Sequence, residues 1–197
     1  MVGRGLVAFV ALMWLAAPAG AASILVSNGE APPLRAWLAL CQEQPDECAV
    51  DLEEAEFVRM TQDTMELIEA VNKHVNGTVS PITDRERWGV EDIWEYPIDH
   101  QGDCEDFQLL KRKLLAEAGL PRRAMRMTVV INELGEGHAV LTIRTDGDDL
   151  ILDNRTGAVL RWHETGYSFI KRESSHRTGW VFLAPDPAAP VVTAAAE

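Results

Sequence analysis

Hydrophobic residues in the first half of the chain recur at steps of three and four, which is the spacing of an amphipathic helix. The pattern predicts a short helix that starts after Pro32-Pro33, covers residues 34–41 and ends before Pro45. It also predicts a longer helix over residues 54–75, which Asn76-Gly77 would end. Both helices would turn one apolar face toward a core.

A third helical pattern begins after Gly102 and ends at Gly119-Leu120-Pro121. Its apolar residues follow Cys104 at steps of three and four, so this cysteine is expected in the first turn, facing inward. The preceding segment, residues 80–100, mixes prolines and a glycine with aromatic residues and predicts an ordered but irregular connection. Its tryptophans, Trp88 and Trp94, are expected to pack in the interior, and lining of a substrate cleft is the alternative.

After Pro121 the hydrophobic period changes to two, which predicts β-strands. Strands are expected over residues 125–131, 138–145, 150–154, 159–162, 167–172 and 180–183. Asp146-Gly147 is a dipeptide typical of a tight hairpin turn. Helices followed by antiparallel strands indicate an α+β fold, with N-terminal helices packed on a C-terminal antiparallel sheet in a single domain over residues 23–184.

The two ends of the chain differ from this domain. Arg4 precedes a ten-residue apolar run and then a stretch of small residues, which is the pattern of a cleavable signal peptide over residues 1–22. A membrane-spanning helix needs roughly 20 apolar residues, and no later segment supplies them. We therefore expect an exported, periplasmic protein without a membrane span after cleavage. Residues 185–197, rich in proline and alanine, predict a disordered tail.

The charge balance narrows the classes of partner. Lys and Arg number 18 against 31 Asp and Glu, a formal charge of −13. An acidic chain repels polyanions, so nucleic acid is excluded as an expected partner. An excess of carboxylates is compatible with hard cations, although it is also the composition of an ordinary solvated surface.

The three cysteines leave one thiol over in an oxidising compartment. Cys41 and Cys48 are close enough in sequence to close a short loop by a disulfide, which would leave Cys104 free. Two reduced buried thiols, or a bond from Cys104 to either of the others, are the alternatives.

Cys104 is a candidate nucleophile because the start of a helix stabilises a thiolate through its unpaired N–H groups and the positive end of its dipole. The same turn could supply an N–H donor for a tetrahedral oxyanion. The alternative is a buried structural cysteine. Cysteine catalysis also requires a base, normally a histidine oriented by a third polar group.

The predicted hairpin brings such a base and its partner together. If Asp146-Gly147 forms a two-residue turn, Asp153 lies opposite Val140, and His138 lies diagonally on the same face. A three-residue loop would instead place Asp153 on the other face. His100, close to Cys104 in sequence, is the alternative base.

Acidic residues crowd the start of the third helix at Asp103, Glu105 and Asp106. They could simply complement the helix dipole, with Asp103 as the N-cap. Three carboxylates around a thiol would also raise its pKa unless a cation offsets them, and oxygen ligands suit Ca²⁺. Calcium is therefore the second interpretation of this cluster.

Three ordered blocks, residues 102–107 (GDCEDF), 137–141 (GHAVL) and 150–154 (LILDN), resemble the Cys, His and Asp blocks of the bacterial transglutaminase-like cysteine proteinases. The similarity extends over residues 34–183. It implies a papain-like or transglutaminase-like core, with Cys104 as nucleophile, His138 as base and Asp153 as orienting acid. It also implies calcium near the nucleophile, held by Asp103 and Glu105, with Asp106 as a further candidate.

The periplasmic adhesin-processing branch of that family implies two partners. One is a protein substrate, the N-terminal region of a large surface adhesin, cut at an alanine pair. The other is an inner-membrane cyclic di-GMP receptor that controls access to the substrate. The resemblance thus implies an exported cysteine endopeptidase. A transglutaminase or amidase with the same triad, or a non-catalytic calcium-binding module, are the alternatives.

Overall fold

A computed structural model describes residues 23–185 of the chain. The predicted signal peptide, residues 1–22, lies outside this range, as does the predicted tail apart from Pro185, which ends the last strand. Within residues 23–185, no helix is long and apolar enough to cross a membrane.

Two of the predicted helices lie where the sequence pattern placed them, and a short helix also forms within the segment that was predicted to be irregular. The helices are α1 (Arg35–Glu43), α2 (Gln62–Thr78), α3 (Asp84–Trp88) and α4 (Cys104–Glu117), with 3₁₀ turns at Pro45–Glu47, Arg122–Ala124 and Trp162–Glu164. The prediction for α2 was wrong at both ends. The helix begins only after Thr61, whose side chain accepts a hydrogen bond from the Thr64 N–H at 3.1 Å, and it continues past Asn76-Gly77.

The residues before Thr61 are not helical because they pair with a distant loop. The backbone N–H of Val58 donates to the Arg144 carbonyl at 2.8 Å, and the Asp146 N–H donates to the Val58 carbonyl at 3.1 Å. These contacts satisfy the backbone of Val58 without a helix. The helical spacing of Phe57 and Met60 was therefore coincidental.

The strands form a sheet whose neighbours all run antiparallel, in the order β1-β9-β8-β4-β5-β6-β7. Their bounds are β1 Leu25–Ala31, β4 Met125–Ile131, β5 Gly137–Ile143, β6 Leu150–Leu152, β7 Leu160–Arg161, β8 Ser168–Glu173 and β9 Trp180–Pro185. A separate parallel pair joins β2 (Ser80–Pro81) to β3 (Gln101–Gly102). The sequence did not predict β1, because a register shift between Ser27 and Glu30 interrupts the alternation of this edge strand.

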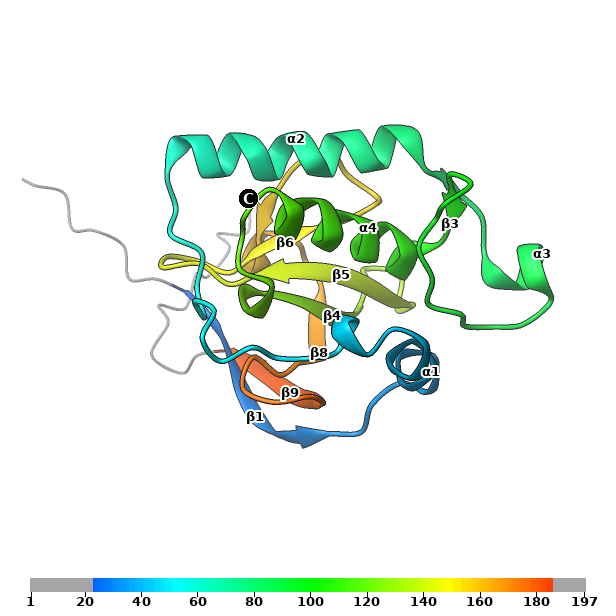
Figure 1. The fold of residues 1–197 in the computed structure, drawn as a ribbon, viewed down its shortest axis with the longest axis horizontal. Coiled ribbons are helices and arrows are strands. Elements are labelled where there is room, and N and C mark those ends of the chain that lie inside the picture. The colour runs from blue at the N-terminus through cyan, green and yellow to red at the C-terminus, as the bar shows by residue number, and fades with distance from the viewer. Residues whose placement is uncertain (1–22, 186–197) are drawn as a thin grey trace, which may run out of the picture.

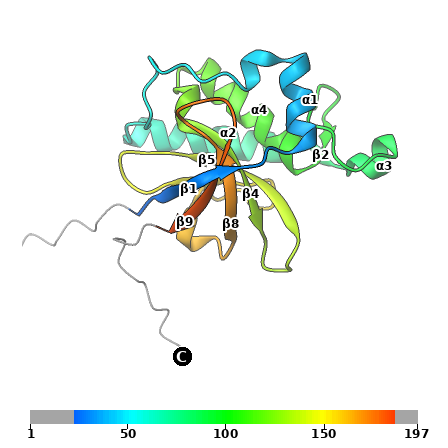
Figure 2. The ribbon, with the colours of Figure 1, turned by 90° about the horizontal axis from the view of Figure 1, so that it is seen from below.

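Helices α1, α2 and α4 lie on one face of the sheet, whereas α3 projects beyond its edge (Figures 1 and 2). Helix α4 packs on β4 and β5, and α2 lies over α4. This arrangement confirms the predicted α+β class, with helices packed on an antiparallel sheet. It also brings the first turn of α4, where Cys104 lies, to the strand that carries His138.

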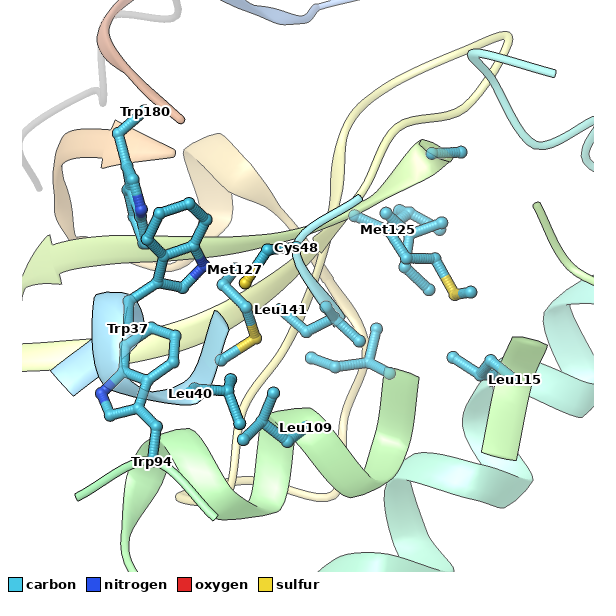
Figure 3. Close-up of a cluster of buried hydrophobic side chains, with 14 of the residues drawn as sticks. Trp37, Leu40, Cys48, Trp94, Leu109, Leu115, Met125, Met127, Leu141 and Trp180 are labelled. Atoms are coloured by element: carbon cyan, nitrogen blue, oxygen red, sulfur yellow. The ribbon is translucent and has the colours of Figure 1, made fainter. Parts of the chain in front are cut away.

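The core between helices and sheet is built around indole rings (Figure 3). Trp180 meets Trp37 and Trp94 edge to face, at centroid distances of 5.9 and 6.1 Å. Trp94 is buried as predicted, whereas Trp88 is 50% exposed, so its predicted burial was wrong. The predicted disulfide between Cys41 and Cys48 is present and leaves Cys104 free.

The opposite face of the sheet has its own small core. Alternation along β4 and β5 turns Val130 and Val140 away from the helices, and Ile151 joins them. The segment that contains Tyr167 and Phe169 packs over these residues. This packing brings residues that follow β7 in the chain to the ends of β5 and β6.

Candidate active site

Cys104 occupies the first position of α4, as the sequence predicted. Its thiol donates a hydrogen bond to Glu105 Oε2 at 3.1 Å, and the backbone N–H of Ala139 on β5 donates to the sulfur. Burial, together with the charge and hydrogen bond of Glu105, raises the pKa of Cys104 well above its ordinary value. In this arrangement the thiol holds its proton. Within residues 23–185, no hydrogen bond joins the sulfur to the His138 ring.

His138 and Asp153 form the pair that the hairpin register predicted. Leu141 lies opposite Leu152, so continuing the pairing by one residue sets Asp153 opposite Val140. The His138 Nε2 atom lies 2.8 Å from Asp153 Oδ1, and their side chains are 7% and 4% exposed. Since Nε2–H donates to the carboxylate, the lone pair of Nδ1 is the basic site of the neutral ring.

The connection between these strands is longer than the predicted two-residue turn. Residues 144–149 lie outside β5 and β6, and the Thr145 hydroxyl donates to the Asp148 carbonyl at 2.7 Å. The register is nevertheless the one that a two-residue turn gives.

Several groups that the sequence did not single out hold Asp153 in place. The Tyr167 hydroxyl donates to Asp153 Oδ2 at 2.6 Å, and the backbone N–H of Arg155 donates to Oδ1 at 3.0 Å. Asn76 on α2 donates from Nδ2 to the Asp153 carbonyl at 2.8 Å. Burial alone would raise the pKa of Asp153, but hydrogen bonds from His138, Tyr167 and Arg155 outweigh it and lower the pKa.

His100, the alternative base, has a different environment. Its side chain is exposed and makes no hydrogen bond within residues 23–185, and its backbone has a positive φ of 62°. Its carbonyl accepts the Ser80 N–H at 2.8 Å. The backbone of His100 thus contributes to the hydrogen bonds that join the segments leading into β2 and β3. His138, in contrast, has the carboxylate partner that cysteine catalysis requires.

Carboxylates gather beside Cys104. One oxygen from each of Asp84, Asp103 and Glu105 lies within 4.8 Å of the others. The sequence had indicated Asp103 and Glu105 but not Asp84, which comes from the first turn of α3 and is 2% exposed. Asp103 occupies the N-cap position of α4 as expected, but its side chain does not cap the helix.

The chemistry of this cluster fits a hard cation. Burial and the neighbouring charge of Asp84 raise the pKa of Asp103, and burial and Asp103 raise that of Glu105 well above its ordinary value. Within residues 23–185, none of the three carboxylates forms an ion pair with a lysine or arginine, and Asp103 Oδ1 is buried without a hydrogen-bond partner. An oxygen-rich, anionic set without a counter-ion is the environment that Ca²⁺ prefers.

Asp106, the further candidate ligand, is not part of this set. Its Oδ1 accepts the Glu95 N–H at 2.9 Å and so ties the loop after α3 to the first turn of α4. Gly102 makes room for it, since a Cβ there would lie 2.6 Å from Asp106 Oδ2. Asp106 therefore holds the loop that carries Glu95 against the start of α4, next to the acidic cluster.

Known proteins with similar structures carry the same fold. The chain superposes on the structure of EGTA-treated LapG from Legionella pneumophila with a TM-score of 0.52 and 25% sequence identity. The superposition covers 60% of this chain and 67% of that one. A second Legionella pneumophila LapG structure gives a TM-score of 0.51 and 26% sequence identity, with 59% of this chain and 66% of that one covered. The calcium-bound Legionella pneumophila LapG gives a TM-score of 0.52 and 23% sequence identity, with 64% of this chain and 74% of that one covered. No curated protein sequence matches the chain.

The sequence comparison reaches further along the chain than these superpositions. The profile of Peptidase_C93, described as bacterial transglutaminase-like cysteine proteinase BTLCP, matches residues 27–187. That range includes Cys104, His138, Asp153 and the acidic cluster. The chain therefore belongs to the bacterial transglutaminase-like cysteine proteinase family.

Proposed function

We propose that this protein is a calcium-dependent cysteine endopeptidase in which Cys104 is the nucleophile, His138 the base and Asp153 the orienting acid. The observation that carries the proposal is the buried 2.8 Å contact between His138 and Asp153. Ala139, the residue after His138 on β5, donates its N–H to the Cys104 sulfur and so links this pair to the nucleophile. An imidazole paired with a carboxylate, one residue along the strand from the backbone group that contacts a cysteine at a helix start, supports acyl transfer.

The residues divide the reaction as follows. His138 Nδ1 takes the thiol proton, and the thiolate attacks the peptide carbonyl to form a C–S bond. Backbone N–H groups at the start of α4 stabilise the oxyanion. The C–N bond then breaks, and the leaving amine takes the proton from His138. Water, deprotonated by the same ring, hydrolyses the thioester and regenerates the thiol.

The proposal gives Glu105 a second role. In the described arrangement, its carboxylate accepts the thiol hydrogen bond. Asp84, Asp103 and Glu105 would hold Ca²⁺, whose charge would stabilise a nearby thiolate. A Glu105 carboxylate engaged as a ligand no longer holds the thiol proton, which leaves His138 as its acceptor.

Calcium binding has a readout that is independent of activity. We expect Ca²⁺ added to chelator-treated protein at about 100 times its Kd to stabilise the fold by about 2.7 kcal/mol, which corresponds to a thermal shift of roughly 5–10 °C. Asp84→Asn and Asp103→Asn should abolish the shift and the calorimetric heat, because each removes an anionic ligand. Asp63→Asn, at an exposed position on α2, is the matched control and should leave both unchanged. Equal shifts in all three variants would exclude this cluster as the site.

We place the substrate outside the cytoplasm. The proposed signal peptide and the Cys41–Cys48 disulfide both favour export to the periplasm. Membership of a proteinase family supports a protein substrate. From the resemblance of the motifs, we propose the N-terminal region of a surface adhesin as that substrate and an inner-membrane cyclic di-GMP receptor as the regulator.

The test compares the surface and secreted proteins of cells that carry the wild-type chain or Cys104→Ala. A protein shortened at its N-terminal region only by the wild type would identify the substrate. The purified pair, supplied with this substrate and a labelled amine, then distinguishes the reactions. Cleavage without incorporation of the amine supports an endopeptidase, incorporation would show a transglutaminase, and neither would leave a calcium-binding module.

A further inference from the structure

Tyr167 lies between the 3₁₀ turn Trp162–Glu164 and strand β8, outside the blocks that carry the proposed triad. Resting on the proposed function, we propose that Tyr167 is a positioning residue that fixes Asp153 and the His138 ring for catalysis. No sequence pattern indicated this tyrosine. Its contacts with both members of the pair indicate the role.

The first contact divides the Asp153 carboxylate between separate partners. Oδ1 accepts from His138 Nε2 at 2.8 Å and from the Arg155 N–H at 3.0 Å, and Oδ2 accepts from the Tyr167 hydroxyl at 2.6 Å. Rotation of the carboxylate would break all three hydrogen bonds together. The phenol therefore keeps Oδ1 directed at the imidazole.

The second contact orients the imidazole itself. The rings of Tyr167 and His138 meet edge to face, with centroids 6.0 Å apart and an interplanar angle of 83°. The His138 side chain is only 7% exposed. The tyrosine ring thus covers the His138–Asp153 hydrogen bond and restricts rotation of the imidazole.

The phenol remains a hydrogen-bond donor at neutral pH. Burial and the hydrogen bond to Asp153 raise the pKa of Tyr167 above its ordinary value. Arg155, which pairs with Glu133 at 2.9 Å, lies near the same phenol without reversing this shift. The contact with Asp153 is consequently a neutral donor on a charged acceptor, which is a strong type of hydrogen bond.

Tyr167→Phe separates positioning from packing. The phenyl ring keeps its place over Val130, Val140 and Ile151, so the fold is expected to persist. Removing the hydroxyl is expected to lower kcat roughly tenfold with little change in KM, because a hydrogen bond to a charged group is lost. Tyr96→Phe is the matched control, since the hydroxyl of Tyr96 lies near another carboxylate, that of Glu47.

A spectroscopic readout makes the test independent of turnover. The Nε2 proton of His138 should give a low-field NMR resonance, assigned by its loss in His138→Gln. In Tyr167→Phe this resonance should broaden through faster exchange with water, whereas Tyr96→Phe should retain it. A chain without proteolytic activity would overturn the proposed function, and the resonance would still decide the role of Tyr167. A wild-type resonance in Tyr167→Phe, or effects no larger than in Tyr96→Phe, would overturn the positioning role.

Discussion

Replacing Cys104 with alanine is expected to reduce proteolysis by roughly 10⁴- to 10⁶-fold, to the level of the background reaction. The proposed reaction passes through a thioester, and alanine offers no atom that can form it. The same variant should keep the fold, because within the described residues the thiol donates to the adjacent Glu105 and accepts one N–H, that of Ala139, so few contacts are lost. Cleavage of the protein substrate by purified enzyme is the measurement, and the thermal midpoint confirms folding.

The two candidate bases provide the control for this result. His138→Gln should show a loss comparable to that of Cys104→Ala, since both act as one unit. His100→Gln should retain activity close to wild type, because its exposed ring contacts no carboxylate in residues 23–185. Residual activity in Cys104→Ala, or inactivity of His100→Gln, would refute the assigned roles.

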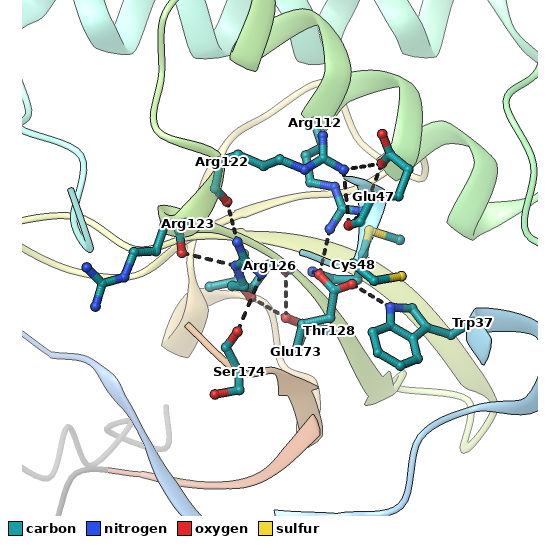
Figure 4. A network of polar contacts seen from close by, with 12 residues as sticks. Trp37, Glu47, Cys48, Arg112, Arg122, Arg123, Arg126, Thr128, Glu173 and Ser174 are labelled. Carbon is teal, nitrogen blue, oxygen red and sulfur yellow. Dashed lines mark hydrogen bonds and ion pairs between the residues drawn. The ribbon is translucent and has the colours of Figure 1, made fainter. Parts of the chain in front are cut away.

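The second large effect concerns stability and the buried ion pair beneath α4 (Figure 4). Replacing Glu173 with alanine is expected to lower the free energy of unfolding by about 3–5 kcal/mol, because it leaves a buried guanidinium without its main partner. Arg112 is completely buried, and its Nη1 lies 2.6 Å from Glu173 Oε2. The same carboxylate accepts from Trp37 Nε1 at 2.6 Å and from the Met127 N–H at 3.0 Å.

The pKa of Arg112 supports the assignment of this charge. Burial disfavours the charged guanidinium, but Glu173 and Glu47 outweigh it and hold the pKa of Arg112 above its ordinary value. In Glu173→Ala, the buried Arg112 guanidinium therefore loses its main counter-ion. Unfolding by urea measures the loss.

An exposed ion pair on α2 is the matched control for Glu173. Glu69 lies 3.0 Å from Lys73 one helical turn away, and both side chains are largely solvated. Glu69→Ala should change the free energy of unfolding by less than about 0.5 kcal/mol. Similar losses in Glu69→Ala and Glu173→Ala would mean that burial of the Arg112 pair has no energetic consequence.

The fold could be predicted where a period and its end signals coincide. Helix α4 and strand β4 follow the expected pattern because each directs apolar residues at the expected spacing into the core and Gly119-Leu120-Pro121 separates them. The start of α2 could not be predicted, since pairing of Val58 with the distant loop at Arg144 competes with local helix spacing. The edge strand β1 was missed because it is shaped by pairing with β9 rather than by its own alternation.

The candidate site divides in the same way. The facing of His138 and Asp153 follows from strand register, which a two-residue turn predicts correctly although the real connection between β5 and β6 is longer. Tyr167, just before β8, and Asp84, on α3, reach the site through tertiary contacts, so no local pattern reveals them. Sequence reasoning thus located the proposed catalytic groups but not the residues that orient them or complete the acidic cluster.

The most direct test of the account is the rate at which iodoacetamide alkylates Cys104 with Ca²⁺ present. Cys41 and Cys48 are joined, so Cys104 is the one thiol of the chain that can react. At about pH 6, an ordinary thiol with a pKa near 8.5 is almost fully protonated and reacts slowly. We predict rapid alkylation of the wild type and a loss of rate of at least about tenfold in His138→Gln, because the imidazole takes the thiol proton. Equal, slow rates in the two proteins would contradict it.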